Sequence, residues 1–322
     1  MGNHAPHRTK TLALTAAAAL ASTGSVYLGA RNLLSEQAAQ TRRVIPKAWD
    51  IPPRADGVYT AGGGPVERWH RDVPVDLHLM VFGDSTATGY GCTEADEVPG
   101  VLLARELAEV SGKRIRLSTK AIVGATSKGL SGQIDAMFVA GPPPDAAVIM
   151  IGANDVTALN GIGPSARRLA HAVRRLRASG AVVVVGTCPD FGVISAIPQP
   201  LRMVARSCGL RLARAQAAAV RAADGVPVPF SDLLAPDFRQ TPELLFSPDM
   251  FHPSAAGYAL AAKQLFPALC NALGDWLGGA VPELPWQPRA DDGATLVARV
   301  GSLSRLWRRS TGVPAPIVAR AG

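Results

Sequence analysis

The sequence lacks several features that would identify other classes of protein. None of its four cysteines, Cys92, Cys188, Cys208 and Cys270, has Cys-x-x-Cys spacing, and no His-Glu-x-x-His motif occurs, so no zinc site is indicated. Aromatic residues make up only 5% of the chain and are not interleaved with its basic residues, although the net charge is +8. No Gly-x-Ser-x-Gly elbow occurs either, which disfavours the α/β-hydrolase superfamily. We therefore expect no metal, no cofactor and no nucleic-acid partner.

Charge is absent from residues 11–30, which follow the basic start MGNHAPHRTK and precede Arg31. This pattern is typical of an export signal or an uncleaved membrane anchor. An Ala-rich surface helix is the alternative, but such a helix would need a polar face. We expect residues 1–35 to be this signal or anchor, with cleavage left open. The chain is then exported, to the cell envelope or beyond it.

Acidic residues are absent from residue 293 onward, where five arginines occur. Leu296, Val300, Leu303 and Trp307 follow helical spacing there. Such a basic amphipathic helix can lie on an anionic membrane, or it can pack on the rest of the protein with its arginines in water. We assign residues 276–322 to a basic C-terminal extension and leave both alternatives open.

Residues 36–75 are rich in turn formers, among them Pro46, Pro52, Pro53 and residues 62–64, and are expected to form a linker. In an exported chain the four cysteines allow two disulfides, with Cys188–Cys208 the first pair to test. The simpler expectation is that the cysteines are small buried residues.

Residues 76–275 alternate short apolar runs with helical periodicity, which predicts a parallel sheet covered by helices on both faces. The predicted strands are residues 77–82, 114–124, 146–152, 181–187 and 226–230. The predicted helices are residues 98–112, 127–139, 164–179, 201–223 and 254–272. The segment GIGPSA (161–166) matches a dinucleotide-binding pattern formally, but it begins about ten residues beyond its strand, so we interpret it as a loop.

The first predicted strand runs into VFGDSTATGYG (81–91), where Ser85 follows the strand end. A turn there either ends the strand or exposes the serine hydroxyl for chemistry. A serine is a nucleophile only when a base removes its proton, so the second interpretation needs a histidine.

One of the six histidines suits that role. His252 lies in SPDMFHPSAAG (247–257), before the last predicted helix, with Asp249 three residues earlier. This spacing lets one loop present an imidazole and a carboxylate that orients it. By contrast, His78 lies within a predicted strand and is expected to pack in the core, and His171 lies on an Arg-rich helix and is expected to be exposed.

Two further turns supply hydrogen-bond donors for an oxyanion. IGAND (151–155) offers the side-chain amide of Asn154, and IVGATS (122–127) offers the backbone N–H of Gly124. The Ser85 N–H is the third candidate. Each turn alone is also what a strand-to-helix connection requires.

Together, Gly83-Asp84-Ser85, Gly124, Gly152-x-Asn154-Asp155 and Asp249-x-x-His252 resemble the four blocks of the SGNH, or GDSL, hydrolase family, in that family's order. The resemblance covers roughly residues 77–272, although Thr86 stands where the family commonly has Leu. It implies a flavodoxin-like three-layer α/β/α sandwich. It also implies a Ser85–His252–Asp249 triad and an oxyanion hole formed by Ser85, Gly124 and Asn154.

The expected activity is hydrolysis of short-chain carboxylic esters through an acyl-Ser85 intermediate. Short acyl groups are favoured because the residues after Ser85, such as Thr86, Ala87 and Gly89, are small and do not indicate a long apolar tunnel. An O-acyltransferase or a deacetylase of cell-envelope glycans is the alternative. A non-catalytic envelope binding protein is disfavoured, since it would need neither Asp249 nor His252. The expected partners are a small-molecule or glycan ester and a membrane surface.

Overall fold

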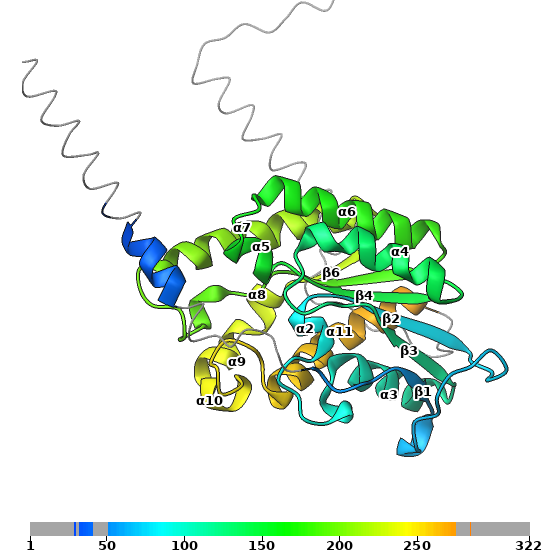
Figure 1. The fold of residues 1–322 in the computed structure, drawn as a ribbon. Coiled ribbons are helices and arrows are strands. Elements are labelled where there is room, and N and C mark those ends of the chain that lie inside the picture. The colour runs from blue at the N-terminus through cyan, green and yellow to red at the C-terminus, as the bar shows by residue number, and fades with distance from the viewer. Residues whose placement is uncertain (1–28, 30–31, 41–50, 275–283, 285–322) are drawn as a thin grey trace, which may run out of the picture. The chain divides into compact units, whose positions relative to one another are not determined.

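The computed structural model describes residue 29 and residues 32–40, 51–274 and 284, and within them a single six-stranded sheet. In the order β1-β3-β2-β4-β5-β6, its strands are Gly57–Tyr59, Ile115–Thr119, Leu77–Gly83, Ala146–Met150, Val182–Gly186 and Val226–Val228. The last five are mutually parallel. Numbered among themselves, these five have the order 2-1-3-4-5 of flavodoxin-like sheets. The predicted fold class is confirmed (Figure 1).

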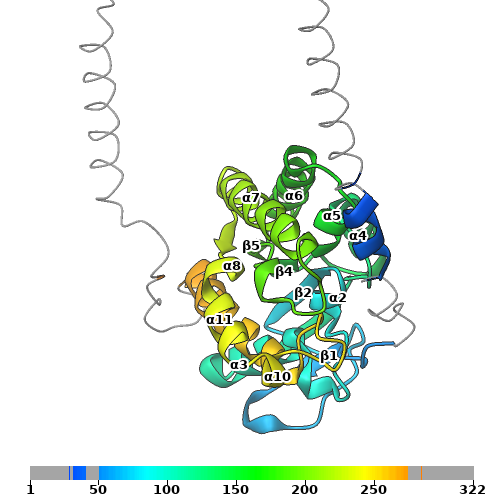
Figure 2. The same cartoon turned by 90° about the vertical axis from the view of Figure 1, so that its left-hand side faces the viewer.

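Helices form a layer on each side of the sheet (Figures 1 and 2). One layer contains α3 (Pro99–Ser111) and α11 (Ala255–Leu273), and the other contains α4 (Leu130–Ala140), α6 (Ile162–Ala178) and α7 (Leu201–Arg221). Strands covered on both faces have no polar side, which explains why β4 and β5 read as continuous apolar runs.

The core between the sheet and the second layer contains side chains from alternate strand positions, such as Phe82 and Ile149. Helix α6 buries Leu169, Val173 and Leu176 against them. The opposite face of α6 carries its arginines toward solvent, and His171 is exposed among them, as predicted.

The predicted linker, residues 36–75, differs from expectation because parts of it are structured. Residues 32–40 form a helix, in which the Gln37 side chain donates to the Gln199 carbonyl and accepts from the Leu201 N–H. Strand β1 pairs antiparallel with β3, so the sheet is mixed rather than purely parallel. Val58 and Tyr59 are both buried in β1, and two apolar residues among prolines and glycines were too weak a signal to predict a strand.

Three other local predictions were wrong. The strand expected at 114–124 ends at Thr119, because a turn carrying Gly124 at φ 78° follows it. The expected loop at 161–166 forms the first turn of α6, which begins at Ile162 after Gly161. Five short helices were missed: α2 (Ser85–Thr88), α5 (Ala153–Thr157), α8 (Phe230–Leu233), α9 (Ala235–Gln240) and α10 (Pro242–Leu245). They are too short for a helical period to show.

All four cysteines are free, so the Cys188–Cys208 pair is not formed in this structure. Cys92, Cys188 and Cys270 are buried as expected, and Cys208 is half-buried. In the part of the chain that the structure describes, no helix is long and apolar enough to cross a membrane. Of the predicted signal or anchor, residues 1–35, only residue 29 and residues 32–35 are described, and of the C-terminal extension only residue 284 is described.

Candidate active site

Ser85 is the first residue of α2, at the carboxyl end of the central strand β2. The turn before it requires glycine, because Gly83 has φ 136° and a Cβ there would lie 1.9 Å from the Met150 carbonyl oxygen. Asp84 then caps α2 by accepting the Thr86 N–H at 3.0 Å. The strand end and the cap together hold Ser85 over the edge of the sheet.

His252 lies between the hydroxyl of Ser85 and the carboxylate of Asp249. Its Nε2 is 3.2 Å from Ser85 Oγ, and its Nδ1 is 2.7 Å from Asp249 Oδ2. Ser85 and His252 are both buried, so bulk water competes little for these contacts. The structure thus joins the predicted triad in one chain of hydrogen bonds, although its serine and histidine lie 167 residues apart in the sequence.

The loop that carries Asp249 and His252 is held by its own backbone. Asp249 Oδ1 accepts the N–H groups of Phe251 and His252, each at 2.9 Å. Burial raises the pKa of Asp249, but the hydrogen bonds from the His252 side chain and from these two N–H groups outweigh it and hold the pKa below its usual 3.8. Asp249 is therefore ionised at neutral pH and can orient the imidazole.

Two aromatic rings pack against the His252 imidazole. Its centroid lies 4.5 Å from that of Tyr90 and 5.0 Å from that of Phe251. The Tyr90 carbonyl in turn accepts the hydroxyl of Tyr258 on α11. These contacts restrict rotation of the imidazole, and nothing in the sequence pattern identified either aromatic residue as part of the site.

Asp84 is a second carboxyl of this site, lying under the nucleophile at 1% exposure. Its Oδ2 has no hydrogen-bond partner among the described residues. Burial raises the pKa of Asp84 from 3.8 to about 6, although the hydrogen bonds from Thr86 act in the opposite direction. Sequence reasoning assigned no role to this carboxyl beyond its place in the motif.

The three predicted oxyanion donors lie at the ends of three adjacent parallel strands, β3, β2 and β4. The Asn154 amide donates one hydrogen to the Ala125 carbonyl at 3.0 Å, which leaves its second hydrogen available. The N–H groups of Ser85 and Gly124 donate to no acceptor within the described part of the chain. Free donors beside a nucleophilic serine are what an oxyanion hole requires.

A buried carboxylate connects two of the donor loops. Asp155, next to Asn154, accepts from the Ser127 N–H and hydroxyl at 2.8 and 2.7 Å. It also accepts from the Ser165 hydroxyl at 2.8 Å and from the Asn160 amide at 3.2 Å. The loop that carries Gly124 is thereby fixed to the loop that carries Asn154.

Two buried glutamines brace the strand ends that carry the site. Gln133 on α4 accepts the Gly83 N–H at 2.9 Å and donates to the Gly83 carbonyl at 2.7 Å. Gln216 on α7 accepts the Cys188 N–H at 2.7 Å and donates to the Ile151 carbonyl at 3.0 Å. Both were missed from the sequence, because a glutamine in an amphipathic helix resembles a surface residue.

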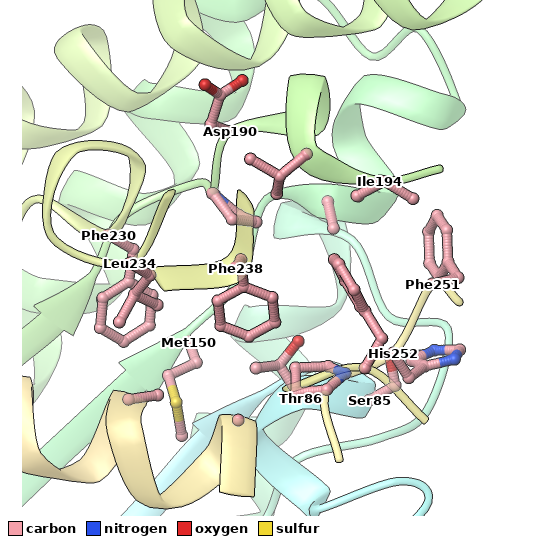
Figure 3. Close-up of a pocket in the computed structure, with 18 of the residues that line it drawn as sticks. Ser85, Thr86, Met150, Asp190, Ile194, Phe230, Leu234, Phe238, Phe251 and His252 are labelled. Atoms are coloured by element: carbon pink, nitrogen blue, oxygen red, sulfur yellow. Dashed lines mark hydrogen bonds between the residues drawn. The ribbon is translucent and has the colours of Figure 1, made fainter. Parts of the chain in front are cut away.

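An apolar pocket of about 80 Å³ opens beside Ser85 and extends toward α8 and α9. Figure 3 shows Ser85 and His252 at one side of it, with Phe230, Leu234 and Met150 at the other and Phe238 between. Most of these apolar side chains come from residues 230–246, far in sequence from the nucleophile. The small residues after Ser85 therefore do not define the acyl side of the site.

The remaining histidine prediction is confirmed: His78 is buried and contacts the Ser118 hydroxyl at 2.9 Å. No group of three or more histidine, cysteine or acidic side chains suited to a metal occurs among the residues that the structure describes.

Comparison with known proteins agrees with this geometry. The family model described as GDSL-like lipase/acylhydrolase matches residues 81–260. A curated relative, the GDSL-like esterase Rv1075c of Mycobacterium tuberculosis, is 72% identical over 281 residues, which cover 87% of this chain and 90% of that protein.

Solved structures with a similar fold include a phospholipase A1 from Streptomyces albidoflavus, at 16% identity and a TM-score of 0.49, covering 60% of this chain and 99% of that one. Another is the psychrotrophic esterase EstA from Pseudoalteromonas, at 19% identity and a TM-score of 0.48, covering 63% of this chain and all of that one.

Proposed function

The chain belongs to the GDSL-like lipase/acylhydrolase family and is an ester hydrolase, and on that premise we propose that it hydrolyses short-chain carboxylic esters through an acyl-Ser85 intermediate. The observation that carries this proposal is the continuous contact from Asp249 through His252 to Ser85, beside an apolar pocket of about 80 Å³.

Acylation begins when His252 Nε2 takes the proton of the Ser85 hydroxyl as its Oγ attacks the ester carbonyl carbon. The new Oγ–C bond leaves a negative charge on the former carbonyl oxygen. That charge is stabilised by the N–H groups of Ser85 and Gly124 and by the Asn154 amide. Asp249 stabilises the imidazolium that forms at the same time.

The tetrahedral intermediate then breaks its bond to the alcohol oxygen, and His252 donates its proton to that oxygen. A water molecule repeats the sequence on the acyl-serine: His252 accepts a proton from it, the hydroxide adds, and the Oγ–C bond breaks as Ser85 regains a proton. A carboxylic acid leaves. Every proton is transferred at Nε2, which is why the imidazole must not rotate.

The pocket supports short acyl groups. A cavity of about 150 Å³ is large enough to bind benzene. A cavity of about 80 Å³ is roughly half that size, and its aromatic walls exclude water from the acyl chain. Acetyl to butyryl groups fit this volume, whereas a fatty acyl chain exceeds it.

The test is to assay the purified protein on p-nitrophenyl esters from acetate to decanoate. We expect the highest kcat/KM between acetate and butyrate, and a loss on the order of 10⁴-fold or more in kcat for Ser85→Ala. Ser195→Ala is the matched control, because this exposed serine follows Ile194 at the pocket wall. Activity that survives in Ser85→Ala would contradict the mechanism, and an optimum at decanoate would contradict the short-chain assignment.

The acyl-enzyme can also pass its acyl group to a sugar hydroxyl, and then the protein is an acyltransferase. Product analysis with and without a glycan acceptor separates the two, since hydrolysis gives free acid at the same rate in both. We propose hydrolysis because the relative that is 72% identical to this chain is described as a GDSL-like esterase.

We also propose that the protein is exported, on the strength of the uncharged segment 11–30 after a basic start. Fractionation of cells that express the full chain tests this: the enzyme should appear in the envelope or the medium. Activity confined to the cytosolic fraction would overturn it.

A further inference from the structure

We propose that a polar hollow lined by Ser127 is a phosphate-binding site. The hollow has a volume of about 320 Å³ and lies between the start of α4 and the exposed face of α6. It shares no lining residue with the apolar pocket beside Ser85. Its walls are Ser127, Lys128, Ser131, Pro164, Arg167, Arg168, His171 and Ala172.

Every charged or titratable side chain in these walls is basic: Lys128, Arg167, Arg168 and His171. Within the described residues none of the four forms an ion pair. The polar contact that the structure gives them is from Arg168 Nη1 to Ser127 Oγ, at 3.4 Å. The nearby carboxylate of Asp155 is buried and already accepts four hydrogen bonds.

The basic residues of α6 are not all without ion pairs, as the next turn of the helix shows. Arg175 binds Asp135 of α4 at 2.6 Å, so the two helices pair charges there. Toward the start of both helices, Ser131 of α4 and Lys128 of the turn before α4 take the place of an acid. Like charges thus converge on a concave space, and this raises the free energy of the empty site.

The sequence of α6 explains why its cations converge. Positions 164, 167, 168, 171 and 172 follow the i, i+3, i+4 spacing of one helix face. The opposite face buries Leu169, Val173 and Leu176 in the core and fixes the rotation of the helix. Because this packing fixes the rotation of α6, its basic face is held toward the hollow.

Phosphate is the ligand that this set of groups fits. It carries up to two negative charges and accepts hydrogen bonds on all its oxygens, so guanidinium groups, an ammonium group and the Ser131 hydroxyl can bind it at once. The positive end of α4, at Ser131, adds to the attraction. The same chemistry occurs in a soluble phosphate ester and in a lipid headgroup.

The test measures phosphate binding directly and does not depend on ester turnover, so it is made on Ser85→Ala as well as on the natural protein. Isothermal titration at 0.15 M salt uses inorganic phosphate and glycerol 3-phosphate. A flotation assay uses phosphatidylcholine vesicles with and without phosphatidic acid. Lys128→Gln/Arg167→Gln is the test variant. Arg174→Gln is the matched control, because Arg174 is exposed on α6 but does not line the hollow.

We expect saturable phosphate binding that weakens about tenfold for each cation removed, hence about 100-fold in the double variant, and less than about twofold in Arg174→Gln. Binding of glycerol 3-phosphate would assign a soluble ester as the source, and binding only to vesicles with phosphatidic acid would assign a lipid headgroup. Circular dichroism of the double variant checks that it is folded. The absence of binding to all these probes, or equal weakening in the double variant and Arg174→Gln, would overturn the proposal.

Discussion

Replacing Asp84 with asparagine tests how much ionisation of this buried carboxyl lowers the free energy of unfolding. Asp84 is buried with one oxygen unpartnered, and burial raises its pKa from 3.8 to about 6. Between these values the folded protein holds a proton that the unfolded chain has released. The stabilisation is therefore complete below pH 3.8 and is lost as the pH rises through 6.

The magnitude follows from the shift. A difference of about 2.2 pKa units corresponds to about 3 kcal/mol in total, of which about 2 kcal/mol is lost between pH 4.5 and pH 7.5. The asparagine side chain of the Asp84→Asn variant keeps the acceptor for the Thr86 N–H but does not titrate. As the pH rises from 4.5 to 7.5, the free energy of unfolding of Asp84→Asn should therefore increase by about 2 kcal/mol relative to that of the natural protein.

Urea unfolding at pH 4.5, 5.5, 6.5 and 7.5 measures the difference, and only the difference is interpreted, because the other titrating groups are common to both proteins. Asp72→Asn, at an exposed carboxylate, is the control and should stay parallel to the natural protein. Parallel curves for Asp84→Asn would refute the reasoning, because they would mean that Asp84 titrates alike in the folded and unfolded states.

Two further predictions concern the residues that the sequence did not reveal. Gln133→Met leaves the buried Gly83 N–H without its acceptor and should cost about 1–3 kcal/mol in the free energy of unfolding, with a fall in kcat because the nucleophile turn loosens. Urea unfolding and initial rates measure both, and unchanged values would show that the brace is dispensable. Phe238→Leu enlarges the acyl pocket and should raise the ratio of kcat/KM for hexanoate over acetate roughly tenfold, since one or two more methylene groups can then be buried. An unchanged chain-length profile would place the acyl group elsewhere.

The sheet and the reacting groups could be predicted because each rests on a local pattern. Continuous apolar runs identified the central strands, and turn glycines marked their ends. The Asp249–His252 spacing needs only one loop to bring both groups together. Ser85 then had to face them, because parallel strands gather their carboxyl ends at one edge of the sheet.

The supporting residues could not be predicted, since their roles depend on contacts across the sequence. Gln133 reaches Gly83 across 50 residues, and Tyr90 contacts His252 from another element. The acyl pocket could not be predicted for the same reason. Its aromatic walls lie in short helices that show no helical period, whereas the residues next to Ser85 are small. Strand β1 could not be predicted because its only apolar residues, Val58 and Tyr59, lie among turn formers.

The two glutamine braces and the aromatic wall of the acyl pocket come from different segments of the chain. Gln133 and Gln216 reach the strand ends from α4 and α7, whereas Phe230, Phe238 and Phe246 come from the segment that leads into α11. Mutation can therefore reshape the aromatic wall of the acyl site while Gln133 still holds the turn that carries the nucleophile. Such a protein can acquire a new ester preference by successive single substitutions, each of which leaves a working enzyme.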